Sequence, residues 1–519
     1  MTHSIPGKPG KPVFLLGGLF LAAHLGLSLS AGLSVDEAHY ALYALRLDWS
    51  YFDHPPLAGW LQVPALALGG SDFAVRCAPL VCWVATIFLI RWLITALFPG
   101  PDSAWNADAG AFILLAGPLF QVLGVALLPA SLLLPIACGV MGLTWRLRDP
   151  ERAVQLGPWL GLGFVLGLAG LSEYTGIFLA VSAAGILLWE FGPRLLAARG
   201  PWVAVAVAAA LISPVLVWNA RHGWISLAYQ ARHAVGAEWR DLGGVEQLLG
   251  RHGPELNDGP RRSWDWRQMA GAELVQIAAY GPLVALGLFF GWRKWRWQPA
   301  TRFCLAFALP PMAVIAAFAG RGGSLPHWAG FAWIAAIPVA AVGLRDGWQS
   351  ARGRRWIAGI GAGQLVLCGL GFALAWSGGP AEDSALRVNP FADLYGWDRA
   401  ADRAKVLAAA NHVDSLAVSN WTLASRLGWY ARPLPVHVLD KRSDQFNIWY
   451  GKLPQGQSAI LIDWSRMSYE LPVSPDQSRG FAECRPAGEL PVERFGRILS
   501  RFNFYLCGDW RGGVEPQRR

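Results

Sequence analysis

Charged residues are scarce in this sequence. Only 15% of its 519 residues are Asp, Glu, Lys or Arg, while 54% are apolar and the mean hydropathy is +0.33. Soluble proteins carry about 25% charged residues, so this composition excludes an ordinary soluble enzyme, a disordered tail and a collagen-like chain. The 44 basic residues outnumber the 35 acidic ones, yet they cluster in short loops between apolar runs, as orientation signals do. We therefore predict a membrane protein with no nucleic-acid partner.

Cysteine is also rare, and its placement is informative. Five of the seven cysteines lie in apolar runs, where Cys acts as a small hydrophobe, and no His/Cys cluster has the spacing of a zinc site. The other two, Cys484 and Cys507, follow the last apolar run. Such a pair in an oxidising compartment is typical of a disulfide, although two unrelated buried thiols would give the same pattern. We predict a Cys484–Cys507 disulfide.

Runs of about 20 mostly apolar residues, the length that spans a bilayer as a helix, stop near residue 376. We predict eleven spans. The first follows Lys8 and Lys11, and we interpret it as an uncleaved span because its apolar run exceeds that of a signal peptide. The predicted spans are 13–31, 73–98, 107–125, 127–145, 156–171, 174–191, 202–218, 270–291, 303–319, 328–344 and 356–376.

The basic residues predict the orientation of these spans. With the N-terminus in the cytoplasm, the inner loops hold fifteen Lys and Arg, whereas the short outer loops hold only Arg46 and Arg321. The loop 219–269 holds seven Arg, but long loops weigh little in this rule. An odd number of spans then places residues 377–519 outside.

The segment after residue 376 is predicted to be an α/β domain, so the chain divides into residues 1–376 and 377–519. We find no internal sequence repeat. Two segments have helical spacing and four short apolar runs are of strand type. The predicted helices are 398–410 and 421–430, and the predicted strands are 414–418, 435–439, 458–463 and 496–507.

The most informative stretch lies in the first outer loop, residues 32–72. Ser34-Val35-Asp36-Glu37 has the form of a capping box, so we predict that Ser34 caps a helix and that the Glu37 carboxylate accepts a hydrogen bond from the Ser34 backbone N–H. A capping carboxylate needs no catalytic role. Asp36 has a structural alternative too, because the helix dipole favours an acid in the first turn.

Further polar and aromatic residues follow on the same predicted helix. Because residues three and four apart are neighbours on a helix, Asp36, Tyr40 and Tyr43 share a face, as do His39 and Tyr43. The chain then runs into Asp53-His54-Pro55-Pro56, whose prolines stop any helix and stiffen the return of the chain. We therefore expect a dense polar cluster against the membrane surface.

These stretches resemble a known family. Asp36-Glu37 after the first span and Tyr51-Phe52-Asp53-His54-Pro55-Pro56-Leu57 are similar to the polytopic glycosyltransferases of the C-type fold that use polyprenyl-phosphate sugars, the relatives of protein O-mannosyltransferases and of the lipid A aminoarabinose transferase. The resemblance runs along nearly the whole chain and is most specific in the first loop. Other stretches that resemble the bacterial branch are Ser213-Pro214-Val215-Leu216-Val217-Trp218-Asn219, Leu325-Pro326-His327-Trp328, Asn389-Pro390-Phe391, Tyr395-Gly396-Trp397 and Trp429-Tyr430-Ala431-Arg432-Pro433.

The sequence departs from the family pattern at three positions. Pro129-Ala130-Ser131 lacks the acid that relatives often carry after the proline, and Ser172-Glu173-Tyr174 has an acid where they often carry Lys. We therefore expect different donor or acceptor contacts there. His54 stands where aminoarabinose transferases have Lys, which argues against that sugar.

A lipid-linked donor fits a site that faces outward at the bilayer surface, because nucleotide sugars are not expected there. Transfer needs a base for the acceptor hydroxyl, and cations or hydrogen-bond donors for the leaving phosphate. We predict Asp36 and Glu37 as the catalytic residues, with Asp36 as the general base. The predicted donor-phosphate or substrate contacts are Tyr40, Asp53, His54, Arg321 and His327.

Structural alternatives remain for several of these residues. His54 and His327 could contact lipid headgroups, and Arg321 could be an interfacial snorkelling residue. In the long loop, Arg251, Arg261 and Arg262 could meet an anionic acceptor or lipid phosphates. Glu173 faces a cavity if it lies within the membrane, and a divalent metal stays undecided.

The resemblance implies an inverting glycosyltransferase of a bacterial inner (plasma) membrane, with a cytoplasmic N-terminus and a periplasmic C-terminal domain. It implies undecaprenyl phosphate as donor lipid, and a lipopolysaccharide, lipid A, another glycolipid or a protein as acceptor. The alternatives are a transporter or flippase for lipid-linked sugars and a membrane-anchored sensor. Transporters usually place ionisable residues near the bilayer midplane on broken helices, so the surface cluster favours the enzyme. The sugar, the acceptor and the oligomeric state stay open.

Overall fold

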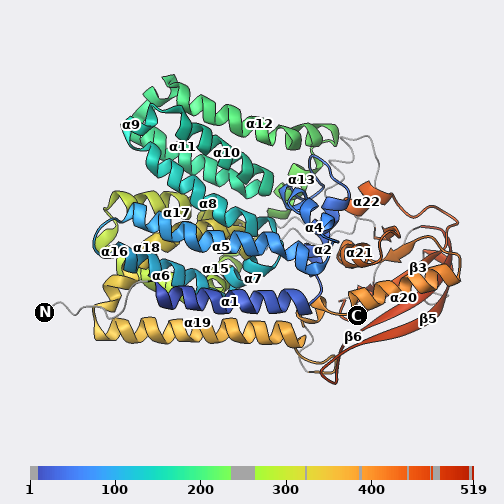
Figure 1. Cartoon of the computed structure of the whole chain (residues 1–519). Helices are drawn as coiled ribbons and strands as arrows, with labels where there is room; N and C mark the ends of the chain where they lie inside the picture. Colours follow the sequence, from blue (N-terminus) through green and yellow to red (C-terminus); the bar gives the residue numbers. More distant parts are fainter. Residues whose placement is uncertain are drawn as a thin grey trace.

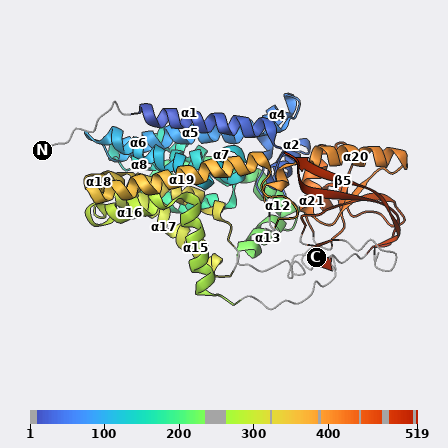
Figure 2. The same ribbon diagram turned by 90° about the horizontal axis from the view of Figure 1, so that it is seen from below.

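A computed structural model describes residues 10–234, 263–321, 324–384, 389–440, 443–467, 469–470, 480–512 and 517–518. A bundle of long helices lies beside a smaller domain that contains the strands, and the two meet at the end of the bundle where α1 finishes (Figure 1). Figure 2, a view from below, shows the same arrangement, with α1 and α19 running along the bundle toward the smaller domain.

All eleven predicted spans are helical. Among the described residues, eight helices are long and apolar enough to cross a membrane, or ten if each of two bent pairs forms one span. The bends measure 75° and 98°, and both follow from a Gly-Pro pair that interrupts the helical hydrogen bonds. The number of spans therefore stays a prediction. The bent pairs are α6 (Ser103–Ala116) with α7 (Pro118–Val125), and α15 (Trp266–Tyr280) with α16 (Pro282–Trp295).

The remaining bundle helices differ in burial. Helix α18 (Gly330–Trp348) is buried on nearly all sides and forms the centre, whereas α12 and α19 expose most of their apolar side chains, as helices in contact with lipid do. The others are α1 (Lys11–Ser30), α5 (Asp72–Leu97), α8 (Pro129–Leu147), α10 (Leu156–Ser172), α11 (Ile177–Phe191), α12 (Arg199–Arg221), α17 (Pro299–Ala319) and α19 (Ala351–Ser377).

Short helices connect these elements at the two ends of the bundle. Those beside the smaller domain include α2, α4 and α13 (Figure 1). The short elements are α2 (Val35–Leu45), α3 (Leu57–Trp60), α4 (Val63–Ala67), α9 (Pro150–Ala153), η1 (Tyr174–Gly176), η2 (Gly192–Ala197), α13 (Ile225–Ala234) and η3 (Pro326–Ala329).

The C-terminal part forms the α/β domain that the sequence predicts. Its main sheet has the order β2-β1-β3-β6-β5; β2, β1 and β3 are parallel, with Leu416 opposite Val436 and Ile460, and β3, β6 and β5 are antiparallel. Strand β5 and helix α22 were not predicted. The elements are η4 (Ala392–Leu394), α20 (Trp397–Ala410), β1 (Leu416–Val418), α21 (Trp421–Tyr430), β2 (Val436–Val438), α22 (Gln445–Tyr450), β3 (Ala459–Trp464), β4 (Tyr469–Glu470), β5 (Phe481–Arg494), β6 (Arg497–Trp510) and β7 (Gln517–Arg518).

The two cysteines of this domain lie directly opposite each other. Cys484 in β5 pairs with Cys507 in β6 in the antiparallel register, and their sulfur atoms are bonded. The bond joins the edge strand of the sheet to its neighbour.

The end of α21 attaches the C-terminal domain to the bundle. The Tyr430 hydroxyl donates to Asp72 Oδ2 at 2.6 Å and accepts from the Leu33 N–H at 2.8 Å, while Trp429 Nε1 donates to Asp72 Oδ1 at 3.1 Å. Gly32 allows this approach, because a Cβ there would lie 2.9 Å from the Tyr430 hydroxyl. The Trp-Tyr stretch therefore joins α21 to the ends of α1 and α5.

Two other motif stretches act at the same junction. Asn389 Nδ2 donates to the carbonyls of Gly378 and Pro380 at 2.8 and 2.7 Å. The Tyr395 hydroxyl donates to the carbonyl of Ala375 in the last turn of α19 at 2.7 Å. Both contacts fix the chain where it leaves the bundle.

Candidate active site

A cavity of about 190 Å³ lies at the junction of the two parts. Helix α2 and the loop after it, α13, the η3 segment, and the starts of α21 and α22 all contribute to its wall. Five of the residues predicted as site residues from the sequence line it together. The lining residues are Asp36, His39, Tyr40, Phe52, Asp53, His54, Tyr229, Gln230, Leu325, His327, Trp328, Trp421, Asp444 and Gln445.

The predicted hydrogen bond of the capping box is present at the start of α2. Glu37 Oε2 accepts from the backbone N–H and the hydroxyl of Ser34 at 2.9 and 3.0 Å. The same carboxylate binds Arg76 of α5, with Nε 2.7 Å from Oε1, and Arg76 also donates to the carbonyls of Ala31 and Gly32. Glu37 and Arg76 are each 2% exposed. This buried pair fixes α2 relative to α1 and α5, and Glu37 is not among the lining residues of the cavity.

Asp36 differs from its neighbour. Among the described residues, no side chain or backbone group forms a hydrogen bond or ion pair with its carboxylate. Burial raises the pKa of Asp36, and Asp53 and Glu37 act in the same direction, while His39 and Arg426 oppose the rise. A partly buried carboxylate that faces a cavity without a partner can accept a proton.

His39, one turn further along α2, binds Asp53. Its Nε2 lies 3.1 Å from Asp53 Oδ2, and the Tyr43 hydroxyl donates to Oδ1 of the same carboxylate. Burial alone would lower the pKa of His39, but the carboxylates of Asp53, Asp36 and Asp444 raise it above the usual value. In turn, burial would raise the pKa of Asp53, whereas His39 holds it below its usual range.

The hydrogen-bond partners of His39 suit a doubly protonated ring. Nδ1 lies 3.2 Å from the Ser425 hydroxyl, which donates its own hydrogen to the Trp421 carbonyl; the hydroxyl therefore accepts from Nδ1–H. Nε2 faces Asp53, a carboxylate that only accepts when ionised. With both ring nitrogens as donors, this arrangement favours the imidazolium form, in agreement with the raised pKa of His39.

Aromatic rings surround this cation. The centroid of the His39 ring lies 5.2 Å from Tyr43 and 5.6 Å from Tyr40 on its own helix, and 5.3, 6.0 and 6.3 Å from Trp421, Phe446 and Trp449. The last three rings come from the C-terminal domain. A cation is attracted by such rings when it lies over their faces, and both domains build its surroundings.

The C-terminal domain contributes to the cavity the edge of its sheet at which the parallel strands β1 and β2 end. Trp421 begins the helix after β1, and Asp444 and Gln445 begin the helix after β2. Because β1 and β2 are parallel, these residues lie at the same edge, the carboxyl ends of the strands, where α/β sheets usually bind ligands. Gln445 Oε1 also accepts from the Phe52 N–H at 2.7 Å, which joins that edge to the first loop.

The other predicted residues are placed as follows. Arg321 is exposed after α17 and does not line the cavity. Arg251, Arg261 and Arg262 lie outside the described residues. In the part of the chain that the structure describes, no three His, Cys, Asp or Glu side chains form a group that could hold a metal ion.

Ala130 and Glu173, the two bundle positions that depart from the family pattern, lie in segments that contact each other. The Ser172 hydroxyl donates to the Pro129 carbonyl at 2.8 Å, so the end of α10, next to Glu173, meets the start of α8, next to Ala130. Glu173 is 4% exposed, and its Oε2 has no hydrogen-bond partner within the described part of the chain.

Several residues of the cavity were not identified as site residues from the sequence. His39 was placed on the right helix face, but its partners Asp53 and Ser425 are 14 and 386 residues away. Tyr229 and Gln230 follow a long apolar helix with no motif of their own. The Asp444-Gln445 pair precedes a six-residue helix and could have been found only as a helix start after a strand.

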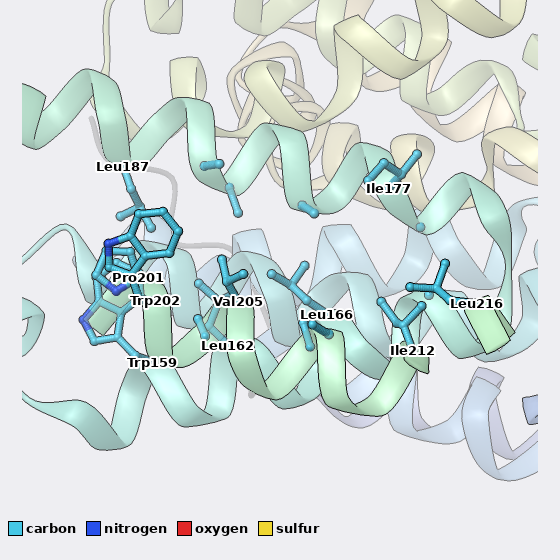
Figure 3. Close-up of a pocket in the computed structure, with 18 of the residues that line it drawn as sticks. Trp159, Leu162, Leu166, Ile177, Leu187, Pro201, Trp202, Val205, Ile212 and Leu216 are labelled. Atoms are coloured by element: carbon cyan, nitrogen blue, oxygen red, sulfur yellow. The ribbon is translucent and has the colours of Figure 1, made fainter. Parts of the chain in front are cut away.

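A second, apolar cavity of about 540 Å³ runs between α10, α11 and α12. Figure 3 shows its aliphatic and aromatic side chains along the three helices, from Trp159 and Trp202 at one end to Ile177, Ile212 and Leu216 at the other. Asn219, Tyr174 and Leu227 line it as well. Leu227 belongs to α13, and α13 also contributes Tyr229 and Gln230 to the first cavity, so one helix borders both.

Known proteins match part of this chain in sequence and nearly all of it in fold. Residues 53–218 match the family model described as dolichyl-phosphate-mannose-protein mannosyltransferase. The lipid A galacturonosyltransferase RgtD of Rhizobium johnstonii is 32% identical over 214 residues, which is 40% of this chain and 42% of the relative. The match thus spans about two fifths of the relative's length.

Solved structures extend the likeness to the whole fold. Crystal structures of ArnT from Cupriavidus metallidurans, bound to undecaprenyl phosphate and in the apo state, align with TM-scores of 0.58 and 0.57 at 16% and 17% identity, and both cover 95% of this chain and 97% of ArnT. The chain therefore has the C-type glycosyltransferase fold of ArnT, and its residues 53–218 carry the sequence pattern of the mannosyltransferase family.

Proposed function

We propose that this chain is a glycosyltransferase that moves a sugar from a polyprenyl-phosphate donor to a glycolipid acceptor outside the cytoplasm, with lipid A as the leading acceptor. A relative named as a lipid A galacturonosyltransferase and a fold shared with ArnT bound to undecaprenyl phosphate support these substrate classes. The observation that carries the proposal is the unpartnered carboxylate of Asp36 in the same cavity as the His39 imidazolium.

In this mechanism Asp36 takes the proton of the acceptor hydroxyl as its oxygen attacks the anomeric carbon of the donor. The bond between that carbon and the phosphate oxygen breaks, and its electron pair stays on the phosphate. Attack from the side opposite the leaving group inverts the anomeric centre. The raised pKa of Asp36 suits this role, because a general base works best when its pKa approaches the working pH.

The leaving phosphate gains negative charge, which the cavity can stabilise. His39 is a fixed cation in an aromatic and largely buried setting, where a charge acts more strongly than in water. His54 and His327 face the same cavity and complete the proposed phosphate contacts. Arg321 is exposed, so we assign it to attracting the donor headgroup rather than to the cavity wall.

The remaining predicted residues position these groups. Asp53 holds His39 protonated, and the Tyr40 ring packs against His54 with centroids 5.3 Å apart, which makes both of them part of the proposed substrate site. Glu37 acts with Arg76 on the position of α2. Asp36 is thus the general base of the pair, and Glu37 is a positioning residue.

The apolar cavity between α10, α11 and α12 is proposed to hold the hydrocarbon chain of the donor. Its walls are almost entirely apolar, and its volume of about 540 Å³ can hold a segment of such a chain. Since α13 borders both cavities, a chain in the apolar one would place its phosphate end near the polar one.

The two domains have different proposed roles, and the protein has a proposed location. Residues 1–376 form the transmembrane glycosyltransferase domain with the catalytic first loop, 32–72, and residues 377–519 form a periplasmic α/β domain that closes the site. The N-terminus is cytoplasmic, and the membrane is the inner membrane of a bacterium.

A flippase for lipid-linked sugars would use the same lipid. The polar cavity argues for the enzyme, because its described lining residues lie at the end of the bundle and none belongs to the two bent helix pairs. Transporter sites are usually built on such broken helices.

Transfer by the purified full chain tests the proposal directly. In nanodiscs with lipid A and a panel of polyprenyl-phosphate sugars, one donor should yield lipid A with an added sugar mass and free polyprenyl phosphate in equal amounts. Mass spectrometry of lipid A, glycolipids and envelope proteins from a deletion strain should show the loss of the same mass. Full transfer by Asp36→Asn, or donor movement across the bilayer without transfer, would contradict the proposal.

A further inference from the structure

A third cavity, of about 230 Å³, lies beside the other end of α2 and is separate from the two already described. It is formed where the last turn of α2 faces α21, the residues after it, and the end of α22. Two arginines and two aromatic rings stand among apolar side chains. The lining residues are Leu42, Leu45, Arg46, Gly428, Arg432, Pro433, Leu434, Trp449 and Tyr450.

Both arginines are held by aromatic rings. The Arg46 guanidinium carbon lies 4.3 Å from the centroid of the Tyr450 ring, and its Nη1 donates to the Trp449 carbonyl at 3.3 Å. The Arg432 guanidinium carbon lies 3.7 Å from the centroid of the Trp429 ring. Stacking fixes the plane of a guanidinium and leaves its N–H groups available at the edge.

Neither guanidinium has an ion-pair partner among the residues that the structure describes. In the described parts of the chain, no carboxylate lies within 4 Å of Arg46 or Arg432. Asp72 is the main charge acting on Arg432, but the oxygens of Asp72 already accept hydrogen bonds from Tyr430 and Trp429. Two stacked guanidinium groups, the exposed one of Arg46 and the half-buried one of Arg432, therefore border one cavity without a carboxylate partner among the described residues.

Trp449 lies close to both this cavity and the candidate active site. Its ring lines the wall beside Arg46, and its centroid lies 6.3 Å from that of His39 and 6.1 Å from that of Tyr43. Arg46 follows His39 by seven residues, which is about 10 Å along a helix axis. One extended headgroup can thus reach both places.

We propose that Arg46 and Arg432 bind a phosphate monoester on the saccharide headgroup of the acceptor lipid, while Leu42, Leu45 and Trp449 contact the apolar faces of its sugars. Guanidinium groups bind phosphate through paired N–H donors, and two of them match the charge of about −1.5 to −2 that a phosphate monoester carries. This inference rests on the proposed function, because it concerns the acceptor of that reaction.

Binding is measured first, since it needs no turnover. The full chain in nanodiscs is titrated with bisphosphorylated lipid A, with the same lipid after enzymatic dephosphorylation, and with inorganic phosphate. Arg46→Gln with Arg432→Gln should weaken binding of the phosphorylated lipid by about 10-fold or more, the scale of hydrogen bonds to charged groups, and should leave the dephosphorylated lipid within twofold. Competition by inorganic phosphate at millimolar concentration identifies the phosphate itself as the bound group, whereas no competition identifies the lipid headgroup as the required source.

The kinetics then separate this site from the catalytic one. The same double variant should raise KM for phosphorylated lipid A with kcat unchanged, the signature of lost uniform binding, and should leave KM for the donor as it was. Arg399→Gln, an exposed arginine on α20, is the matched control and should change neither. Arg46→Lys with Arg432→Lys keeps the charges and should retain part of the affinity.

Two results would overturn the inference: equal weakening for the phosphorylated and the dephosphorylated lipid, or no weakening for either in a variant that melts like the wild type. A wild-type chain that binds phosphorylated lipid A through these arginines and transfers no sugar to it would instead refute the proposed function alone.

Discussion

His39 and Ser425 form a hydrogen bond of 3.2 Å between residues 386 positions apart in the chain. The first residue belongs to the loop between two membrane helices, and the second to a helix of the C-terminal domain. Because the opposite nitrogen of the same ring meets Asp53, His39 links the first loop of the candidate site to the C-terminal domain.

Replacing the proposed base is the most direct test of the site. Asp36→Asn keeps the size of the side chain but cannot accept the proton, so kcat should fall by about 10²–10⁴-fold. Folding should survive, because a first-turn carboxylate contributes only about 0.3–1 kcal/mol through the helix dipole. The measurement is transfer of labelled sugar by the purified chain, with thermal melting beside it.

Asp398→Asn is the matched control for this variant. Asp398 is also the second residue of its helix, and it is exposed, so it shares the dipole environment of Asp36 without the cavity. It should transfer sugar at the wild-type rate. Wild-type activity of Asp36→Asn would mean that another group is the base.

The pH profile should be bell-shaped. The base must be deprotonated, so activity falls as pH drops through the pKa of Asp36, which burial raises above 3.8. His39 must be protonated, and its pKa is raised above 6.5, so activity falls again only as pH rises beyond that value. Values of kcat/KM measured between pH 4 and 10 test both the fall at low pH and the fall at high pH.

His39→Asn should identify the alkaline limb. Removing one preorganised charge or donor at a developing anion costs about 10²–10³ in kcat, and the fall at high pH should disappear with it. A His39→Asn enzyme that keeps the wild-type alkaline limb would assign that limb to another group.

The Glu37–Arg76 pair should matter for stability more than for chemistry. Glu37→Gln leaves a buried guanidinium without its counter-charge, and breaking such a pair by removing one partner costs about 3–5 kcal/mol. The apparent melting temperature should therefore drop, while kcat per folded molecule should stay close to that of the wild type. Adding Arg76→Gln to the same chain should recover part of the loss. A fall in kcat without a fall in melting temperature would give Glu37 a role in catalysis.

The disulfide between Cys484 and Cys507 should stabilise the C-terminal domain. It closes a segment with a sequence separation of 23 residues, which is worth roughly 3 kcal/mol in the chain-entropy model. Cys484→Ser with Cys507→Ser should lower the protease resistance of that domain more than that of the bundle. Peptide mapping under non-reducing conditions checks the bond, and two free thiols after acid quench would refute it.

The orientation in the membrane can be tested with reporters. The basic inner loops predict a C-terminus outside the cytoplasm, so an alkaline phosphatase fused there should be active. Activity of a reporter that works only in the cytoplasm would show that the predicted number of spans is wrong by one.

The sequence predicted those features that depend on local pattern. Eleven apolar runs became helices, and the capping pattern of Ser34 and Glu37 gave the start of α2 with its hydrogen bond. Strand β5 escaped prediction because Phe481–Arg494 carries five charged residues and two prolines, as an exposed edge strand allows. The bends at Gly117 and Gly281 separate helices that hydropathy alone joins into one run.

Only the part of the candidate site that belongs to the first loop could be predicted from the sequence. Asp36, Tyr40, Asp53 and His54 lie within one loop, where spacing and motif are visible. The partner of Glu37 is Arg76, inside an apolar run, and three of the rings around His39 come from residues 421–449. No local pattern links positions so far apart, because the packing of α2 against α5 forms the first contact and the docking of the C-terminal domain forms the others.

The contacts of α21 with the bundle, from Tyr430 to Asp72 and Leu33 and from Ser425 to His39, can form only after most of the chain has been synthesised. At about 5–20 residues per second, the ribosome needs roughly 20 to 80 s to cover the 386 residues between His39 and Ser425. Before α21 is made, the first two membrane helices are already complete. Asp72 still lacks Trp429 and Tyr430, and the cavity still lacks the side of its wall that the C-terminal domain forms. The membrane helices of a nascent chain can therefore be inserted well before a working site exists, and a chain that terminates early, before α21, would reach the membrane without one.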